Sequence, residues 1–340
     1  MFHVGIGFPE IEYSKAVDWT TLNNYDSVSS SRSLFWTDIV HAVRVRQWAK
    51  NALLFGGFLF AGRLRAGAQM WPELGRVLLA LACFCALSGA TYLLNDWSDV
   101  ARDRLHPTKR NRPLASGRMS TRFALGLIVG LLALALFCIA VIVLSAPQAI
   151  GFAAAAAAYF ALTLAYSWVL KHEVIVDVLC LASGFVVRVV AGCLAIPVEI
   201  SPWIVFCTFT LALFIALCKR RAELLEVGEN AVHTRRALPL YTVSLLDTFI
   251  AIAAGLTITA YSLYTFNAPH DKALGEDATN SPVLMTTIPF VVYGVFRYLF
   301  LAHSSVVGGT PEQMLRDKPL VINVLLWVLL VALLTATARL

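Results

Sequence analysis

Long apolar stretches are the feature that most constrains how this chain can fold. Residues 125–144 read LGLIVGLLALALFCIAVIVL and contain no charged side chain, and similar stretches recur along the sequence. About 20 consecutive apolar residues allow an α-helix to cross the hydrocarbon core of a bilayer. The composition agrees, because 59% of the residues are hydrophobic and 14% are charged, whereas soluble domains have about 25% charged residues. The sequence therefore predicts an all-α, polytopic integral membrane protein.

The apolar stretches predict nine membrane-spanning helices. The first is the least regular, because Arg44, Arg46 and Lys50 lie in its N-terminal half and charge inside hydrocarbon is costly. Residues 1–35 are polar and contain no apolar signal-peptide core, so we expect a loosely ordered cytosolic extension before a transmembrane domain at 36–340. The expected spans are residues 40–62, 75–95, 122–145, 148–170, 174–196, 202–219, 240–266, 283–303 and 319–338.

Lysine and arginine are concentrated in alternate loops between these spans. The loops after the second, sixth and eighth spans are basic, whereas the loops between them are poor in basic residues or acidic. The positive-inside rule then places the N-terminus and the basic loops in the cytoplasm, on one face of an inner or plasma membrane. Arg63 and Arg65, after the first span, deviate mildly from this pattern. The net charge of +6 therefore indicates orientation, and it does not by itself indicate nucleic-acid binding.

An acidic segment, NDWSDVARD, follows the second span at residues 95–103. Asp96, Asp99 and Asp103 are spaced i, i+3, i+7, and Asn95 stands four residues before Asp99, so these side chains share one face if the helix continues past the membrane. Three carboxylates on one face repel one another unless a cation lies among them. Oxygen ligands suit Mg²⁺, which completes its coordination with water and substrate phosphate. We therefore expect these four residues to bind Mg²⁺ and the three aspartates to be catalytic.

A basic segment, HPTKRNRPLASG, follows directly. Arginine matches phosphate oxygens with a planar fork of donors, and lysine adds a compact charge. Lys109 and Arg112 are therefore candidate phosphate ligands. Acidic residues that bind Mg²⁺ next to basic residues that bind phosphate predict a diphosphate site that opens to the cytoplasm.

These two segments resemble the NDxxDxxxD and KxxRP motifs of the UbiA superfamily of intramembrane prenyltransferases. The resemblance covers about residues 36–338 and implies nine transmembrane helices around a central cavity. Many members carry a second aspartate-rich motif at the end of the sixth helix, but this chain reads KRRAEL at 219–224. That segment, together with RVRQWAKN at 44–51, is similar to the decaprenyl-phosphate phosphoribosyltransferase branch. Val45 departs from that branch, which has proline there.

The branch implies transfer of 5-phosphoribose from phosphoribosyl diphosphate (PRPP) to a polyprenyl phosphate such as decaprenyl phosphate. Diphosphate is released, Mg²⁺ is required, and the product serves cell-envelope arabinan or a related glycolipid precursor. The alternative is a Mg²⁺-dependent aromatic or quinone prenyltransferase that uses a polyprenyl diphosphate. The loss of the second acidic motif favours PRPP, whose 5-phosphate needs a cationic pocket of its own. Lys219 and Arg220, or Arg46 and Lys50, are candidates for that pocket.

Arg188 lies in the middle of the fifth expected span, where a charge must face a cavity or a partner. We expect it to reach a substrate phosphate. Its pairing with Asp177 is excluded, because eleven residues of helix separate them by about 16 Å. Asp177 itself could orient a ribose hydroxyl or hold Lys171, and both interpretations stay open. The resemblance adds Tyr166 and Lys171 as a YxxxxK pair that binds substrate. Glu223 is expected to pair with Lys219, four residues earlier.

Overall fold

The computed structural model describes residues 36–60, 63, 67–105, 109–196, 198–227, 238–267, 282–304 and 316–337, and its regular elements in these ranges are all helical. The all-α prediction is therefore confirmed. Seven of the described helices are long and apolar enough to cross a membrane, and the apolar part of an eighth, Lys318–Leu334, is shorter. The extension expected at 1–35 lies outside the described residues.

The helices follow the predicted apolar stretches closely after the first one. Ser120 caps one of them, because its hydroxyl accepts a hydrogen bond from the Phe123 amide at 3.3 Å. The α-helices are α2 (Gly56–Phe60), α3 (Met70–Ser98), α4 (Val100–Leu105), α5 (Thr121–Ser145), α6 (Ile150–Trp168), α7 (Val176–Ala195), α8 (Pro202–Val227), α10 (Val243–Asn267), α11 (Ile288–His303) and α13 (Lys318–Thr337).

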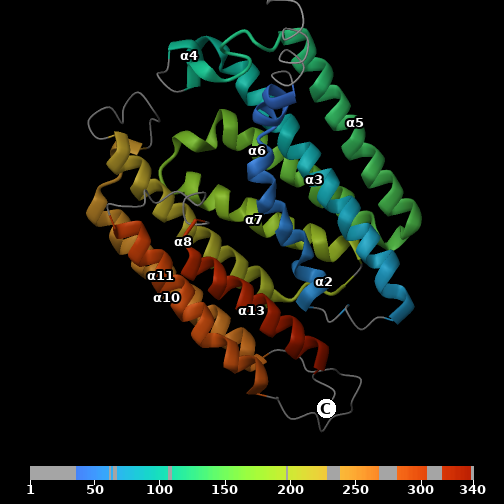
Figure 1. Cartoon of the computed structure of the whole chain (residues 1–340), viewed down its shortest axis with the longest axis vertical. Helices are drawn as coiled ribbons and strands as arrows, with labels where there is room; N and C mark the ends of the chain where they lie inside the picture. The colour runs from blue at the N-terminus through green and yellow to red at the C-terminus, as the bar shows by residue number, and fades with distance from the viewer. Residues whose placement is uncertain are drawn as a thin grey trace, which may run out of the picture.

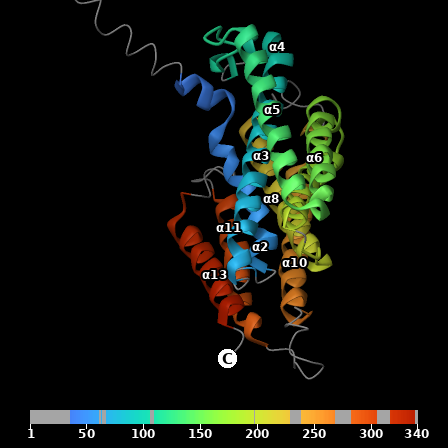
Figure 2. The same ribbon diagram turned by 90° about the vertical axis from the view of Figure 1, so that its right-hand side faces the viewer.

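Helix α7 lies between two groups of helices. α3 and α5 run along one side of it, and α10, α11 and α13 lie on the other, while α4 caps one end of the bundle (Figures 1 and 2). Ala191 and Ala195 of α7 pack in a buried cluster with α3, α5 and α6, and Val178 of α7 packs in a second cluster with α8, α10 and α11. α7 therefore joins two hydrophobic cores. By contrast, the most apolar part of α5 is only 22% buried, which suits a helix that faces lipid.

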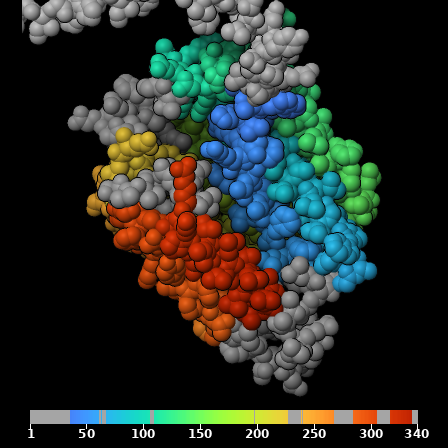
Figure 3. Space-filling view, in the orientation of Figure 1, coloured from blue at the N-terminus to red at the C-terminus, as the bar shows by residue number. Residues whose placement is uncertain are grey.

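The structure differs from the regular helix expected at 40–62. Val45–Phe55 forms a 3₁₀ segment, η1, and only Gly56–Phe60 is α-helical. Polar side chains of η1 bond to neighbouring helices: Gln47 accepts a hydrogen bond from Tyr92 of α3 at 2.9 Å. Irregular backbone at membrane depth is tolerated where protein or a polar cavity surrounds it. Figure 3 shows that the molecule is hollowed between this blue segment and the orange and red C-terminal helices.

Two glycines allow this segment to approach α7 closely. A Cβ added to Gly192 of α7 would lie 2.0 Å from the carbonyl oxygen of Leu54 in η1. A Cβ on Gly57 of α2 would likewise lie 2.7 Å from Sγ of Cys193. Only glycine fits at both positions, so backbone contact with α7 fixes where the irregular segment lies.

Gly192→Ala should therefore destabilise the protein by about 1–3 kcal/mol, the usual cost of overpacking a close contact. The backbone of η1 would have to move, because no side-chain rotation relieves a contact with a carbonyl group. Thermal unfolding of the full chain in detergent measures the effect. Gly130→Ala on α5 is the control, because a Cβ there meets no described atom within 4 Å. Equal stability of the two variants would contradict the packing argument.

Candidate active site

The acidic motif lies where α3 ends and α4 begins. Asp99 follows α3 directly, and its amide donates to the Asn95 carbonyl at 3.0 Å, while the Asp103 amide donates to the Asp99 carbonyl at 2.8 Å. The chain therefore stays nearly helical through the motif, as the spacing predicted. Asp96 and Asp103 are buried, with 4% and 3% of their surface exposed, and Asn95 and Asp99 are partly exposed.

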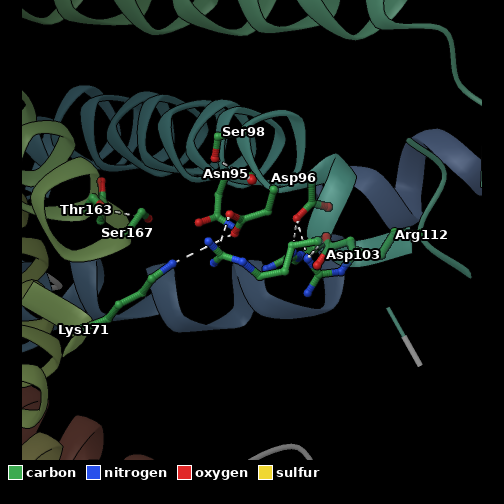
Figure 4. Close-up of polar contacts among 11 residues, drawn as sticks. Asn95, Asp96, Ser98, Asp103, Arg112, Thr163, Ser167 and Lys171 are labelled. Carbon is green, nitrogen blue, oxygen red and sulfur yellow. Dashed lines mark hydrogen bonds and ion pairs between the residues drawn. The ribbon is translucent and has the colours of Figure 1, made fainter. Parts of the chain in front are cut away.

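A guanidinium group lies between the two buried carboxylates. Nη1 of Arg112 donates to Asp96 at 3.0 Å and to Asp103 at 2.7 Å, as Figure 4 shows. Nη2 of Arg44, at the start of η1, donates to Asp96 at 2.5 Å, and this guanidinium also lies over the ring of Tyr92. The cation that the clustered carboxylates require is thus supplied by arginine side chains of the protein itself.

Asp99 faces a different cation. Nζ of Lys171 lies 4.0 Å from its Oδ2, and Lys171 extends toward the acidic motif from the 3₁₀ turn Leu170–His172 after α6 (Figure 4). Nη1 of Arg102 lies 3.5 Å from the other oxygen of Asp99. The structure thus brings the YxxxxK lysine to the acidic motif. Lys171 therefore pairs with Asp99 and not with Asp177. Holding Lys171 is one of the two roles that the sequence leaves open for Asp177, and the structure does not support it.

Asp177 instead pairs with Arg220. Both side chains are 1% exposed, and Nε of Arg220 donates to Asp177, while its other nitrogens donate to Glu223 and, at 3.0 Å, to the hydroxyl of Tyr166. The hydroxyl of Tyr241 donates to the second oxygen of Asp177 at 2.8 Å. Burial raises the pKa of Tyr241 to about 12, so this hydroxyl keeps its proton near neutral pH. Arg220 was predicted to bind phosphate, but its guanidinium is engaged by these protein groups.

Arg188 is also engaged by the protein. Its guanidinium donates to Asn51 at 2.8 Å, to the Gly184 carbonyl at 2.8 Å and to the Tyr159 hydroxyl at 2.7 Å, and it is 7% exposed. These acceptors are neutral, and the Tyr159 ring lies under the guanidinium. A charge inside the membrane was expected to face a partner or a cavity. For Arg188 the partners are these polar groups, which join η1, α6 and α7. Contact between Arg188 and a substrate phosphate stays a prediction.

The remaining basic candidates lie nearer the surface. Lys219 lies 4.0 Å from Glu223, so the predicted helical pair is confirmed. Lys50 donates to Gln47 at 3.5 Å. Arg46 is exposed and Lys109 is partly exposed.

Arg44 is the site residue that sequence reasoning missed. It was recognised only as a charge that makes the first span irregular. Its place in RVRQWAKN, the segment that resembles the phosphoribosyltransferase branch, was the available signal. Its backbone is left-handed, with φ 54°, a conformation uncommon for a residue other than glycine, and it directly precedes η1.

The donor atoms of the motif are suited to a hard divalent cation. Among the described residues, no three His, Cys, Asp or Glu side chains are already gathered around one metal position. However, the carboxylates of Asp96 and Asp103 already converge on a single cationic nitrogen of Arg112. Such oxygen donors are the kind that Mg²⁺ prefers. The oxygen donors present therefore fit a hard divalent cation such as Mg²⁺.

Comparison with known proteins identifies the family. The model of the UbiA prenyltransferase family matches residues 55–301. The chain belongs to this family. It is 33% identical to a decaprenyl-phosphate phosphoribosyltransferase of Mycolicibacterium smegmatis, over 85% of this chain and 90% of the relative. A protein of the same name from Corynebacterium glutamicum is 32% identical, over 85% of this chain and 84% of the relative.

A solved structure shares the UbiA fold. A UbiA homolog from Archaeoglobus fulgidus, bound to GPP and Mg²⁺, superposes with a TM-score of 0.65. The match covers 88% of this chain and 99% of the homolog at 18% sequence identity, so it shows the fold alone. The resemblance inferred from NDWSDVARD and KRRAEL is confirmed by the family and by the two phosphoribosyltransferase relatives.

Asp177→Asn should lower the free energy of unfolding by about 3 kcal/mol, because it leaves the buried Arg220 with one carboxylate fewer. Chemical or thermal unfolding in detergent measures this. Asp38→Asn is the control: it breaks the pair with Arg118, whose side chain is 45% exposed, and exposed pairs contribute about 0–1 kcal/mol. A loss no greater for Asp177→Asn than for Asp38→Asn would show that the buried pair is not structural.

Proposed function

We propose that this UbiA-family protein transfers 5-phosphoribose from PRPP to decaprenyl phosphate and releases diphosphate. The observation that carries the proposal is the similarity, over 85% of the chain, to proteins named decaprenyl-phosphate phosphoribosyltransferases. The structure adds a physical reason. Arg220 stands where many family members have an acidic motif, and it is tied to Asp177 and Glu223. Asp177 of α7 and Glu223 of α8 are thus paired with a cation of the protein itself.

The transfer exchanges one C–O bond at ribose C1 for another. The bond to diphosphate breaks with its electron pair on the leaving oxygen, and C1 gains positive charge. An oxygen of decaprenyl phosphate then forms the new bond to C1. This acceptor is already an anion, so it needs no strong general base. The chain must therefore stabilise the charge on the departing diphosphate and orient the two substrates.

The cationic groups around the acidic motif are suited to the diphosphate. Arg112, Arg44 and Lys171 all lie within 4.0 Å of a motif carboxylate. They can therefore turn from protein carboxylates to phosphate oxygens with small movements. Lys109 precedes Arg112 in the same loop and is assigned to the same anion.

The motif residues are assigned to the metal. Asn95, Asp96, Asp99 and Asp103 would hold Mg²⁺, whose chemistry is to neutralise diphosphate charge as it develops. Nη1 of Arg112 donates to oxygens of both Asp96 and Asp103. We infer that Arg112 and the metal compete for these oxygens, so that Arg112 leaves the carboxylates and binds substrate phosphate.

Further residues are assigned by position. Arg46, Lys50 and Lys219 are proposed to hold the 5-phosphate, since each carries a positive charge and is at least partly exposed. Asp177, Arg220 and Tyr166 are proposed to position the helices around the substrate, because Arg220 of α8 donates to both Asp177 of α7 and Tyr166 of α6. Arg188 would fix η1 through Asn51.

The membrane arrangement completes the proposal. The seven long helices, together with the η1–α2 segment and α13, would make nine crossings of an inner or plasma membrane. The basic loops would then lie in the cytoplasm with the N-terminus and the active site. There the site meets PRPP, and the product would supply synthesis of cell-envelope arabinan or a related glycolipid.

Purified protein should transfer label from ribose-labelled PRPP to decaprenyl phosphate, in a reaction that requires Mg²⁺. The label should enter the organic phase on lipid extraction, because the product carries the decaprenyl chain. Scintillation counting and mass spectrometry of the lipid measure the transfer. Asp99→Asn is the inactive control. Organic phase without label, together with prenylation of an aromatic acid from decaprenyl diphosphate, would favour a prenyltransferase instead.

Arg112→Gln should tighten binding of Mg²⁺ to the substrate-free protein by about tenfold, or ~1.4 kcal/mol, while it raises KM for PRPP. The variant removes a cation that competes for the carboxylates and also a ligand for the diphosphate. Isothermal titration with the metal alone separates the first effect from catalysis. Arg110→Gln, an exposed neighbour, should leave metal affinity unchanged. Unchanged or weaker metal binding in Arg112→Gln would refute the competition.

A further inference from the structure

A groove lies at the end of α3 that is opposite to the acidic motif. Its volume is about 570 Å³, within the ~300–1,000 Å³ of small-molecule sites. It is formed by the first turns of α3 and the last turns of α5, which run side by side in Figures 1 and 2. Leu78, Leu79 and Val141 make its walls apolar, and Arg76 is the one charged residue among its described lining.

Nε of Arg76 lacks an acceptor in this groove. This atom is enclosed, and it has no hydrogen-bond partner in the part of the chain that the structure describes. Glu73, one turn earlier on α3, lies 3.4 Å from Arg63 through Oε1. Its enclosed Oε2 has no hydrogen-bond partner among the described residues, so the side chains of Glu73 and Arg76 do not satisfy each other. An enclosed guanidinium N–H without an acceptor costs free energy, so an anion in the groove would satisfy it.

The position of Arg76 along α3 indicates where that anion lies. Asp96 follows Arg76 by 20 residues of one helix, which span about 30 Å at 1.5 Å per residue. This length matches the hydrocarbon thickness of a bilayer, also about 30 Å. If the acidic motif lies at one membrane surface, Arg76 lies at the opposite one. Trp71, 68% exposed at the same end of α3, is suited to that interface.

We propose that this groove binds one anionic glycerophospholipid of the leaflet opposite to the acidic motif. Arg76 donates to the headgroup phosphate, and one acyl chain lies along Leu78, Leu79 and Val141. Charge complementarity selects an anionic lipid, and the apolar walls disfavour a soluble anion such as inorganic phosphate. Because the lipid contacts both α3 and α5, its binding stabilises the packing of the two helices that flank the acidic loop, and this stabilisation grows with the logarithm of the lipid concentration once the site is nearly saturated.

The test uses the full chain, purified in detergent and stripped of lipid. Phosphatidylglycerol and phosphatidylcholine with identical acyl chains are each added, and native mass spectrometry counts the lipids that stay bound. We expect one tightly bound phosphatidylglycerol, with at least a tenfold preference over phosphatidylcholine and a higher unfolding temperature. Arg76→Gln should abolish the preference. Arg122→Gln, at an exposed position at the opposite end of α5, should retain it.

A second variant fills the groove without disturbing the fold. A Cβ at Gly75 would meet no described atom within 4 Å, so Gly75→Leu has room inside the groove. This variant should lose the bound lipid while it stays folded and monodisperse. Equal retention of the two lipids, retention of detergent only, or an unchanged preference in Arg76→Gln would each overturn the proposal. None of these readouts depends on transfer activity, so they stand apart from the proposed reaction.

Discussion

Two buried carboxylates, Asp96 and Asp103, can lie side by side only because a cation is placed between them. Like charges that are removed from water repel strongly, and the low polarity of the surroundings strengthens that repulsion. Arg112 resolves it by donating to both, and Arg44 adds a second contact to Asp96. These pairs also determine structure, because they hold the loop after α4 and the start of η1 against the end of α3. The acidic site thereby fixes the positions of the basic segments around it.

The same constraint explains the two arginines deeper in the bundle. A charge within a membrane-spanning segment must have partners. Arg220 has carboxylate partners in Asp177 and Glu223, whereas Arg188 has amide, carbonyl and hydroxyl acceptors. Each arginine joins several helices: Arg220 connects α8 to α6 and α7, and Arg188 connects α7 to α6 and η1. Their first role is therefore to hold the walls of the site in place, which a membrane protein cannot achieve by the hydrophobic effect alone.

Much of this architecture follows from local sequence patterns. The helices after the first follow the apolar stretches, because twenty apolar residues have few alternatives to a helix in a bilayer. The near-helical continuation through Asp99 and the Lys219–Glu223 pair also follow from local spacing. The first segment could not be predicted in this way. Its polar residues Gln47 and Asn51 bond to other helices, and its backbone contacts Gly192, so its path depends on partners that are distant in sequence.

By itself the sequence determined that the chain is an all-α membrane protein, that an acidic segment and then a basic segment follow the end of one helix, and that its motifs are those of the UbiA family. Local periodicity, apolar length and residue type carry that information. Only the tertiary structure decided which charge meets which. It placed Lys171 at Asp99 and Arg220 at Asp177, engaged Arg188 with neutral groups, and added Arg44 to the site. The reason is physical: polar contacts form between side chains that meet in space, and residues up to 137 positions apart make these contacts.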